Sequence, residues 1–113
     1  MRSYFIDELR RNELEKFERS LKDRGFKNPI TDIFWIEVPN ELLTEIQKEH
    51  LTTCGPYIFS VELGKNWIKV ELLIRPTGKI RCECISYATT EQRNYVIDLI
   101  DNLLNANDKT IKA

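Results

Sequence analysis

The side chains best suited to metal chemistry in this sequence are those of His50, Cys54, Cys82 and Cys84, which match a zinc site of one histidine and three cysteines. The gap of one residue between Cys82 and Cys84 falls within a predicted strand, where same-face residues lie about 6.5–7 Å apart. Two thiolates bound to one zinc ion lie within about 4 Å of each other. The spacing therefore favours reduced thiols buried as small apolar groups, and we expect no metal or other cofactor.

Nucleophilic catalysis would require a cysteine beside a histidine, and His50 is the single histidine of the chain. Cys54 is its nearest candidate partner, but the run Thr52-Thr53-Cys54-Gly55 matches no nucleophile motif. A histidine at the end of a helix more often interacts with the last carbonyl groups of that helix. We therefore expect no catalytic residue; an enzyme would require a pocket around His50 and Cys54.

Two carboxylates, Glu71 and Glu83, are predicted to lie opposite each other on paired strands. Such a pair could support acid–base chemistry or bind a cation, although like charges in this position destabilise a sheet. Lys69, Arg75 and Arg81 lie close enough in the predicted register to offset the repulsion. We favour the alternative of a charge-balanced, solvated surface.

Aromatic and charged side chains share one side of the predicted sheet, which we call the mixed face. Trp67 and Tyr87 are predicted neighbours there, and residues 64–87 carry five basic and two acidic side chains. Exposed rings on a basic sheet can stack with single-stranded bases; alternatively, the first helix covers them. Trp35 is a further candidate contact residue on an earlier strand. The candidate binding residues of the mixed face are Trp67, Lys69, Glu71, Leu73, Arg81, Glu83, Ile85 and Tyr87.

The predicted order of the elements that position these residues is α-β-α-β-β-β-α. Apolar residues at helical spacing predict a first helix over 4–24, which Gly25 and Phe26 would cap and Pro29 would prevent from continuing. This order defines an α+β fold, in which an antiparallel three-stranded meander, extended at its edge by an earlier strand, packs against helices. The other predicted elements are strands over 31–38, 57–63, 66–75 and 79–87, a short helix over 40–49 and a last helix over 90–105.

Turn residues predict the register of the meander. Gly64-Lys65 fits a two-residue hairpin loop, which pairs Leu63 with Asn66. In this register most apolar side chains share one face, and the mixed face lies opposite. The first helix either covers the mixed face or packs beside the last helix. A loop over 76–78 would form the second hairpin and pair Ile74 with Ile80, Leu72 with Cys82 and Val70 with Cys84.

Length and composition fit a single domain of 113 residues with 42% hydrophobic and 31% charged side chains. We expect this domain to occupy residues 1–105, followed by a polar tail over 106–113 that frays. Residues 1–8 lack the apolar core of a secretory signal, and no apolar run approaches the length of a membrane span. With three cysteines, an odd number, we expect a cytoplasmic protein without a membrane partner.

The α-β-β-β-α order of residues 40–105, with Gly55-Pro56 followed by alternating Phe59 and Val61, resembles a double-stranded-RNA-binding domain. Domains of that family bind phosphates through a lysine cluster at the start of their last helix. Here the corresponding residues are Thr89-Thr90-Glu91-Gln92-Arg93. Because affinity in such domains depends on neutralising phosphates, this departure removes the main contribution to binding, and we do not assign the chain to the family.

Charge is distributed unevenly along the chain, although the net charge is only −1. Residues 29–63 carry six acidic and one basic side chain, whereas residues 64–87 have an excess of basic ones. Such polarity can orient a protein partner or a second copy of the chain. We therefore predict a non-catalytic module that binds a protein or forms a homo-oligomer through the mixed face. The alternative, a weak nucleic-acid-binding module using the same face, is disfavoured by the net charge.

Overall fold

The computed structural model describes residues 2–78 and 83–112, with side chains as far as residue 105. The predicted α+β class, with an antiparallel sheet packed against helices, is confirmed. The elements in chain order are β1 (Ser3–Ile6), α1 (Arg11–Asp23), β2 (Lys27–Ile30), β3 (Ile33–Glu37), the 3-10 helix η1 (Asn40–Leu42), α2 (Glu45–Glu49), α3 (Leu51–Cys54), β4 (Tyr57–Leu63), β5 (Ile68–Glu71), β6 (Leu73–Pro76), β7 (Ser86–Tyr87) and α4 (Thr90–Lys112).

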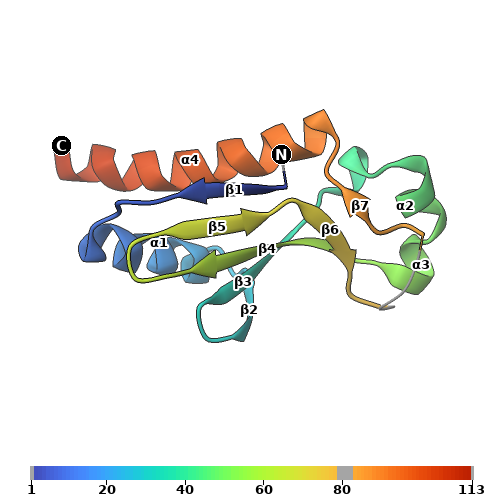
Figure 1. Cartoon of the computed structure of the whole chain (residues 1–113), viewed down its shortest axis with the longest axis horizontal. Coiled ribbons are helices and arrows are strands. Elements are labelled where there is room, and N and C mark those ends of the chain that lie inside the picture. Colours follow the sequence, from blue (N-terminus) through green and yellow to red (C-terminus); the bar gives the residue numbers. More distant parts are fainter. Residues whose placement is uncertain (1, 79–82, 113) are drawn as a thin grey trace.

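The strands form one antiparallel arrangement in the order β2-β3-β4-β5-β1, and β6 pairs with β4 beyond the end of β5 (Figure 1). Because β1 pairs with β5 and β7 pairs with β6, β1 and β7 lie end to end along the same edge. Leu72 joins them: its N–H donates to the carbonyl of Arg2 at 3.0 Å, and its carbonyl accepts from the N–H of Ala88 at 2.8 Å. One outer strand is thus assembled from two segments that are far apart in the sequence.

The two long helices, α1 and α4, pack against each other on the same side of the sheet (Figure 1). Phe17 of α1, Ile100 of α4 and Phe34 of β3 belong to one buried cluster. Tyr4 of β1 donates a hydrogen bond to Asp101 Oδ1 of α4 at 2.6 Å. Of the two predicted places for the first helix, it therefore takes the one beside the last helix. No long helix of the described residues covers the opposite side of the sheet.

The predicted cap of the first helix is confirmed, and a second cap begins α4. Gly25 ends α1 with a positive φ of 78°, and its N–H donates to the carbonyl of Lys22 at 3.0 Å. At the start of α4, the Thr89 N–H donates to Gln92 Oε1 at 3.0 Å and the Gln92 N–H donates to Thr89 Oγ1 at 3.2 Å. The helix continues past its predicted end at residue 105 to Lys112, because no Gly or Pro interrupts residues 106–112.

The predicted start of the first helix is wrong, because the residues before Arg11 include a strand. Phe5 and Leu9 fit helical spacing, yet Tyr4, Phe5 and Ile6 also fit the alternation of a strand. In β1, Tyr4 pairs with Val70, and Phe5 projects to the other side, where it is 51% exposed. Pairing with β5 decided between two patterns that local sequence alone does not separate.

The first hairpin has a longer loop than predicted. Leu63 pairs with Ile68, and the Gly64 N–H donates to the Trp67 carbonyl at 2.8 Å, so the loop spans residues 64–67. The Trp67 ring lies against Gly64, so close that a Cβ at this position would overlap the ring. Relative to the prediction, β5 is shifted by two residues. An even shift moves no side chain to the opposite face, so the predicted division into two faces holds here.

The predicted register of the second hairpin is also wrong. Ile74 pairs with Ser86 rather than with Ile80, and Val70 pairs with Tyr4 and Val61 rather than with Cys84. The predicted partners Ile80 and Cys82 lie outside the described residues. The predicted strand over 66–75 is interrupted at Leu72, where pairing passes from β1 to β7. Trp67 and Tyr87 are consequently not cross-strand neighbours, because Tyr87 pairs with Leu73.

The predicted helix over 40–49 is divided into η1 and α2, and α3 follows directly. Thr44 caps α2, in which the polar Gln47 is buried and the apolar Ile46 is 45% exposed. Buried Gln92 Nε2 donates to Gln47 Oε1 at 3.0 Å and to the Leu42 carbonyl at 2.8 Å. Two buried amides thus connect this segment to α4, a polar contact that hydrophobic periodicity does not reveal.

The hydrogen bond between β1 and α4 should make stability depend on pH in the alkaline range. Burial, the hydrogen bond to Asp101 and the charge of that carboxylate raise the pKa of Tyr4 from 10.0 to about 12. A raised pKa means that its stabilising contribution is complete below pH 10 and is lost as the pH rises towards 12. Between pH 9 and pH 12, the free energy of unfolding should therefore fall more steeply in the wild type than in Tyr4→Phe, as measured by urea denaturation. Parallel pH profiles would contradict the role of this bond.

Candidate binding face

The side of the sheet opposite α1 and α4 is here called the open face. Directly paired residues of an antiparallel sheet project on the same side, as Trp35 and Ser60 do, and as Ser3 and Glu71 do. Following this pairing across the strands gives the residues of the open face. They are Ser3, Phe5, Lys27, Ile30, Ile33, Trp35, Glu37, Ile58, Ser60, Glu62, Lys69, Glu71, Leu73, Arg75 and Tyr87.

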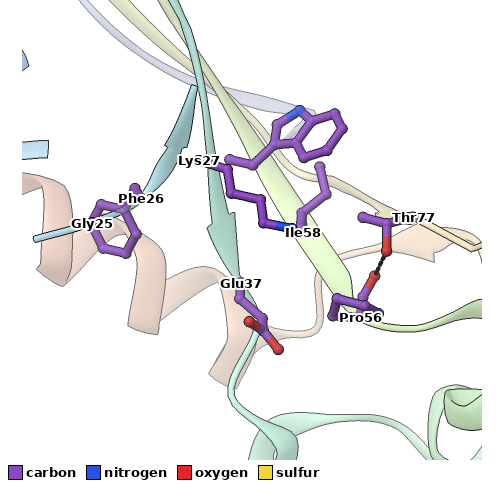
Figure 2. Close-up of a pocket in the computed structure, with 8 residues that line it drawn as sticks. Gly25, Phe26, Lys27, Glu37, Pro56, Ile58 and Thr77 are labelled. Carbon is purple, nitrogen blue, oxygen red and sulfur yellow. Dashed lines mark hydrogen bonds between the residues drawn. The ribbon is translucent and has the colours of Figure 1, made fainter. Parts of the chain in front are cut away.

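One hollow of the open face, with a volume of about 190 Å³, lies over β2, β3 and the start of β4 (Figure 2). Trp35 and Ile58 give it an apolar lining, and Ile58 is only 6% exposed. Figure 2 shows the Lys27 side chain extending towards Ile58, while Glu37 lies on another side of the hollow. The hollow has room for one aliphatic or aromatic side chain, between an ammonium group and a carboxylate.

Two further hollows continue along the open face towards β1 and β7. One of about 130 Å³ lies among Ile33, Glu62 and Lys69. The other, of about 210 Å³, has Leu73 and Tyr87 in its lining. Lys69 and Glu71 line both. The open face is therefore a row of shallow depressions that crosses the sheet from one edge to the other.

Charges of both signs are interspersed among these hollows. Glu71 Oε1 accepts from Arg75 Nε at 2.7 Å, and the Arg2 guanidinium lies 5.7 Å from the centre of the Tyr87 ring. In the part of the chain that the structure describes, neither Lys27 nor Glu37 forms an ion pair. The charged side chains that line the three hollows are the basic Arg2, Lys27, Lys69 and Arg75 and the acidic Glu37, Glu62 and Glu71.

Aromatic rings lie at both ends of this row. Phe5 and Trp67 stack at a tilt, with ring centres 5.6 Å apart, beside the hairpin loop. Tyr87 is 46% exposed at the edge that β1 and β7 share. Trp35 is half-buried near the opposite edge. Both tryptophans of the chain are therefore associated with the open face.

The structure brings together only part of the predicted mixed face. Lys69, Glu71, Leu73 and Tyr87 line one hollow. Trp67 is not part of the lining of this hollow and packs against Phe5. The other three predicted residues are placed elsewhere or not described: Glu83 is exposed beside His50, Ile85 is half-buried next to β7, and Arg81 lies outside the described residues.

The predicted opposition of Glu71 and Glu83 is wrong. Glu71 pairs with Ser3 and binds Arg75, whereas Glu83 Oε1 lies 3.5 Å from His50 Nε2. The reason is the interruption at Leu72, which moves the end of the second hairpin away from β5. Separate surroundings for the two carboxylates give no support to a paired acid–base or cation site.

Cys54 and Cys84 are both buried, as expected for thiols that pack as apolar groups. His50 is half-buried and faces Glu83. Cys82, the remaining member of the predicted zinc set, lies outside the described residues. Within residues 2–78 and 83–112, no group of three or more His, Cys, Asp or Glu is arranged to hold a metal ion.

Sequence reasoning missed several residues of the open face, chiefly Phe5, Lys27 and Glu37. The helical spacing predicts a helix at Phe5, whereas its alternation with Tyr4 and Ile6 is the signal that indicates a strand. Lys27 and Glu37 reach the hollow only because β3 pairs with both β2 and β4. The pairing of β3 with β4 is non-local, because η1, α2 and α3 separate the two strands and no hairpin turn predicts their register.

Comparison of the chain with protein-family models, with curated proteins and with solved structures gives no match. Among the described residues, no helix is both long enough and apolar enough to span a bilayer. Any function must therefore be argued from the geometry and charge of the open face.

The contact between Phe5 and Trp67 gives a spectroscopic test of the position of β1. In a Trp35→Phe background, Phe5→Ala should increase the acrylamide quenching of Trp67, because one side of that indole becomes exposed to water. In a Trp67→Phe background, the same substitution should leave the quenching of Trp35 unchanged. Equal responses in the two backgrounds would contradict the placement of Phe5 on the open face.

Proposed function

We propose that this chain is a non-catalytic cytoplasmic module that binds another protein on its open face. The observation that carries the proposal is the one-sided packing of α1 and α4. With both long helices on one side, the other side retains Trp35, Leu73 and Tyr87 beside hollows in a folded, well-packed sheet. Aromatic residues beside pockets are typical anchors of protein interfaces.

The charge pattern supports a polypeptide partner over nucleic acid. A phosphate backbone gains affinity from each basic side chain it meets and loses affinity at each acidic one. On the open face, Glu62 is paired with Lys69, and Glu71 with Arg75, so acidic groups stand beside the basic ones. A protein surface, which carries both signs, can match such a pattern.

The hollow over Ile58 is the proposed anchor point. Its apolar lining suits an aliphatic or aromatic side chain of the partner. Lys27 and Glu37 would then lie beside the polar groups that flank this side chain. Desolvation of a central apolar anchor inside a polar rim is the arrangement that contributes most affinity in protein interfaces.

Site-directed photocrosslinking tests the proposal directly. A benzophenone amino acid is introduced at Tyr87 on the open face and, as a matched control, at Ile46 of α2, which is 45% exposed against 46% for Tyr87. After irradiation in the source cells, Tyr87 should give a discrete protein adduct that survives nuclease treatment, and Ile46 should not. An adduct that nuclease removes, or the same adducts from both positions, would overturn the proposal.

Once the adduct identifies the partner, truncating the anchor lining should weaken binding. Trp35→Ala should raise the Kd at least tenfold, the effect expected for an aromatic residue at the centre of an interface. Ile46→Ala should leave the Kd unchanged, and unfolding transitions of both variants verify that the fold is intact. Isothermal titration calorimetry with the purified partner measures the difference. If both variants bind with the wild-type Kd, the hollow is not the anchor point.

A further inference from the structure

The two outer strands of the sheet differ in their protection against strand addition. The outer strand β2 reads Lys27-Asn28-Pro29-Ile30, with a charge, a proline that lacks an N–H, and an irregular register against β3. Such features prevent another strand from pairing with an edge. At the other edge, β1 reads Ser3-Tyr4-Phe5-Ile6, with no charge, no proline and strong β propensity.

The hydrogen-bonding direction of β1 follows from its register. The Leu72 N–H donates to the Arg2 carbonyl, so Arg2 directs its backbone groups towards β5. Because this direction alternates along a strand, Tyr4 and Ile6 also bond to β5, whereas Ser3 and Phe5 direct their N–H and C=O groups away from the sheet. Outside the helices and the strand ladders, no backbone hydrogen bond among the described residues involves Ser3 or Phe5. The outward N–H and C=O groups of these two residues therefore form a row at the edge that is open to pairing with another strand.

This edge is held in place rather than frayed. The hydrogen bond from Tyr4 to Asp101 secures β1 to α4. Beyond the strand, the Leu9 N–H donates to the Asn66 carbonyl at 2.9 Å. An incoming strand would therefore meet a preformed template, which lowers the ordering cost of binding.

We propose that the β1 edge binds an extended segment of another protein, which pairs with Ser3 and Phe5 as an additional antiparallel strand. Arg2 lies at one end of β1, and Asp7 and Glu8 follow its other end. An antiparallel segment with a basic N-terminal end and an acidic C-terminal end would place opposite charges together at both ends. Between these ends, alternating apolar residues would continue the surface formed by Phe5.

A second copy of the chain carries the same charges on its own β1, but α4 opposes that occupant. Figure 1 shows α4 running along β1, and the bond between Tyr4 and Asp101 places this helix over the strand. Two paired β1 strands would be about 4.8 Å apart, which would bring the two α4 helices about as close. Packed helices need about 8–10 Å between their axes. A segment without a helix of its own avoids this conflict.

The edge contact is separate from the binding of a partner on the open face, so the two can fail independently. The probe is a fluorescein-labelled peptide with the sequence Gly-Lys-Thr-Val-Thr-Val-Thr-Glu-Gly, and a second peptide exchanges its Lys and Glu. Ser3→Pro removes an outward N–H without removing a hydrogen bond to β5, and Ser3→Ala is the matched control that keeps the N–H. Trp35→Ala alters the open face away from this edge.

Fluorescence polarisation should show that the first peptide binds the wild type, Ser3→Ala and Trp35→Ala with similar Kd, at least tenfold more tightly than Ser3→Pro. It should also bind more tightly than the charge-exchanged peptide. Amide hydrogen exchange should slow at Ser3 and Phe5 when this peptide is added, while Tyr4 and Ile6 are protected with or without it.

Three results would overturn the proposal. The first is no binding of the first peptide up to 1 mM. The second is equal binding to Ser3→Pro and Ser3→Ala when both have the wild-type unfolding transition. The third is a dimer of the chain, detected by analytical ultracentrifugation and abolished by Ser3→Pro. This result would show that a second copy of the chain, rather than another protein, pairs with the edge. Because Tyr87 lies at the edge that β1 and β7 share, the separate test of the open face is the Kd of Trp35→Ala for its partner, since Trp35 lies near the opposite edge.

Discussion

The packing of α1 beside α4 on a single side of the sheet is the constraint on which the rest of the structure depends. Phe17 and Leu21 of α1 and Val96 and Ile100 of α4 bury one side completely. Residues 2–78 and 83–112 contain no further long helix for the other side. The same arrangement that completes the core therefore leaves Trp35 half-exposed, and the open face is a consequence of how the helices are distributed.

This distribution also explains the composition of the open face. A solvated sheet surface is usually polar on alternate residues, yet Ile33, Trp35, Ile58 and Leu73 interrupt the polar residues here. Charged side chains lie among these apolar groups, as the ion pair of Glu71 and Arg75 does beside Leu73. The surface can thus remain hydrated while it retains separate apolar points for contact.

Much of the fold could be predicted because it is encoded locally. The left-handed conformation at the end of α1 favours a glycine, which Gly25 supplies. Thr89 and Gln92 form a cap within one turn of helix. The division of β4 and β5 into two faces also held, since the error in register was even. Each of these features depends on residues that are close together in the sequence.

The predictions failed where the structure of a segment depends on contacts with residues far away in the sequence. Phe5 fits a helix until β5 is known to lie beside it, and Leu72 ends one pairing only because Arg2 and Ala88 both bond to it. Only part of the candidate site was predicted, because its other residues also depend on non-local pairing. Lys69, Glu71, Leu73 and Tyr87 lie on or beside the predicted hairpins, whereas Lys27 and Glu37 arrive through β3.

The outer strand made from β1 and β7 has a consequence for the order of folding during synthesis. Arg2 leaves the ribosome early, but the row that it begins is completed only when Ala88 has been made and can bond to Leu72. Until then, β6 has no neighbour on its outer side. Because translation adds about 5–20 residues per second, the residues between Pro76 and Ala88 leave β6 with an uncovered edge for roughly 1–2 seconds. A nascent chain that pauses within residues 77–88 would remain in this unfinished state, where association with other chains competes with folding.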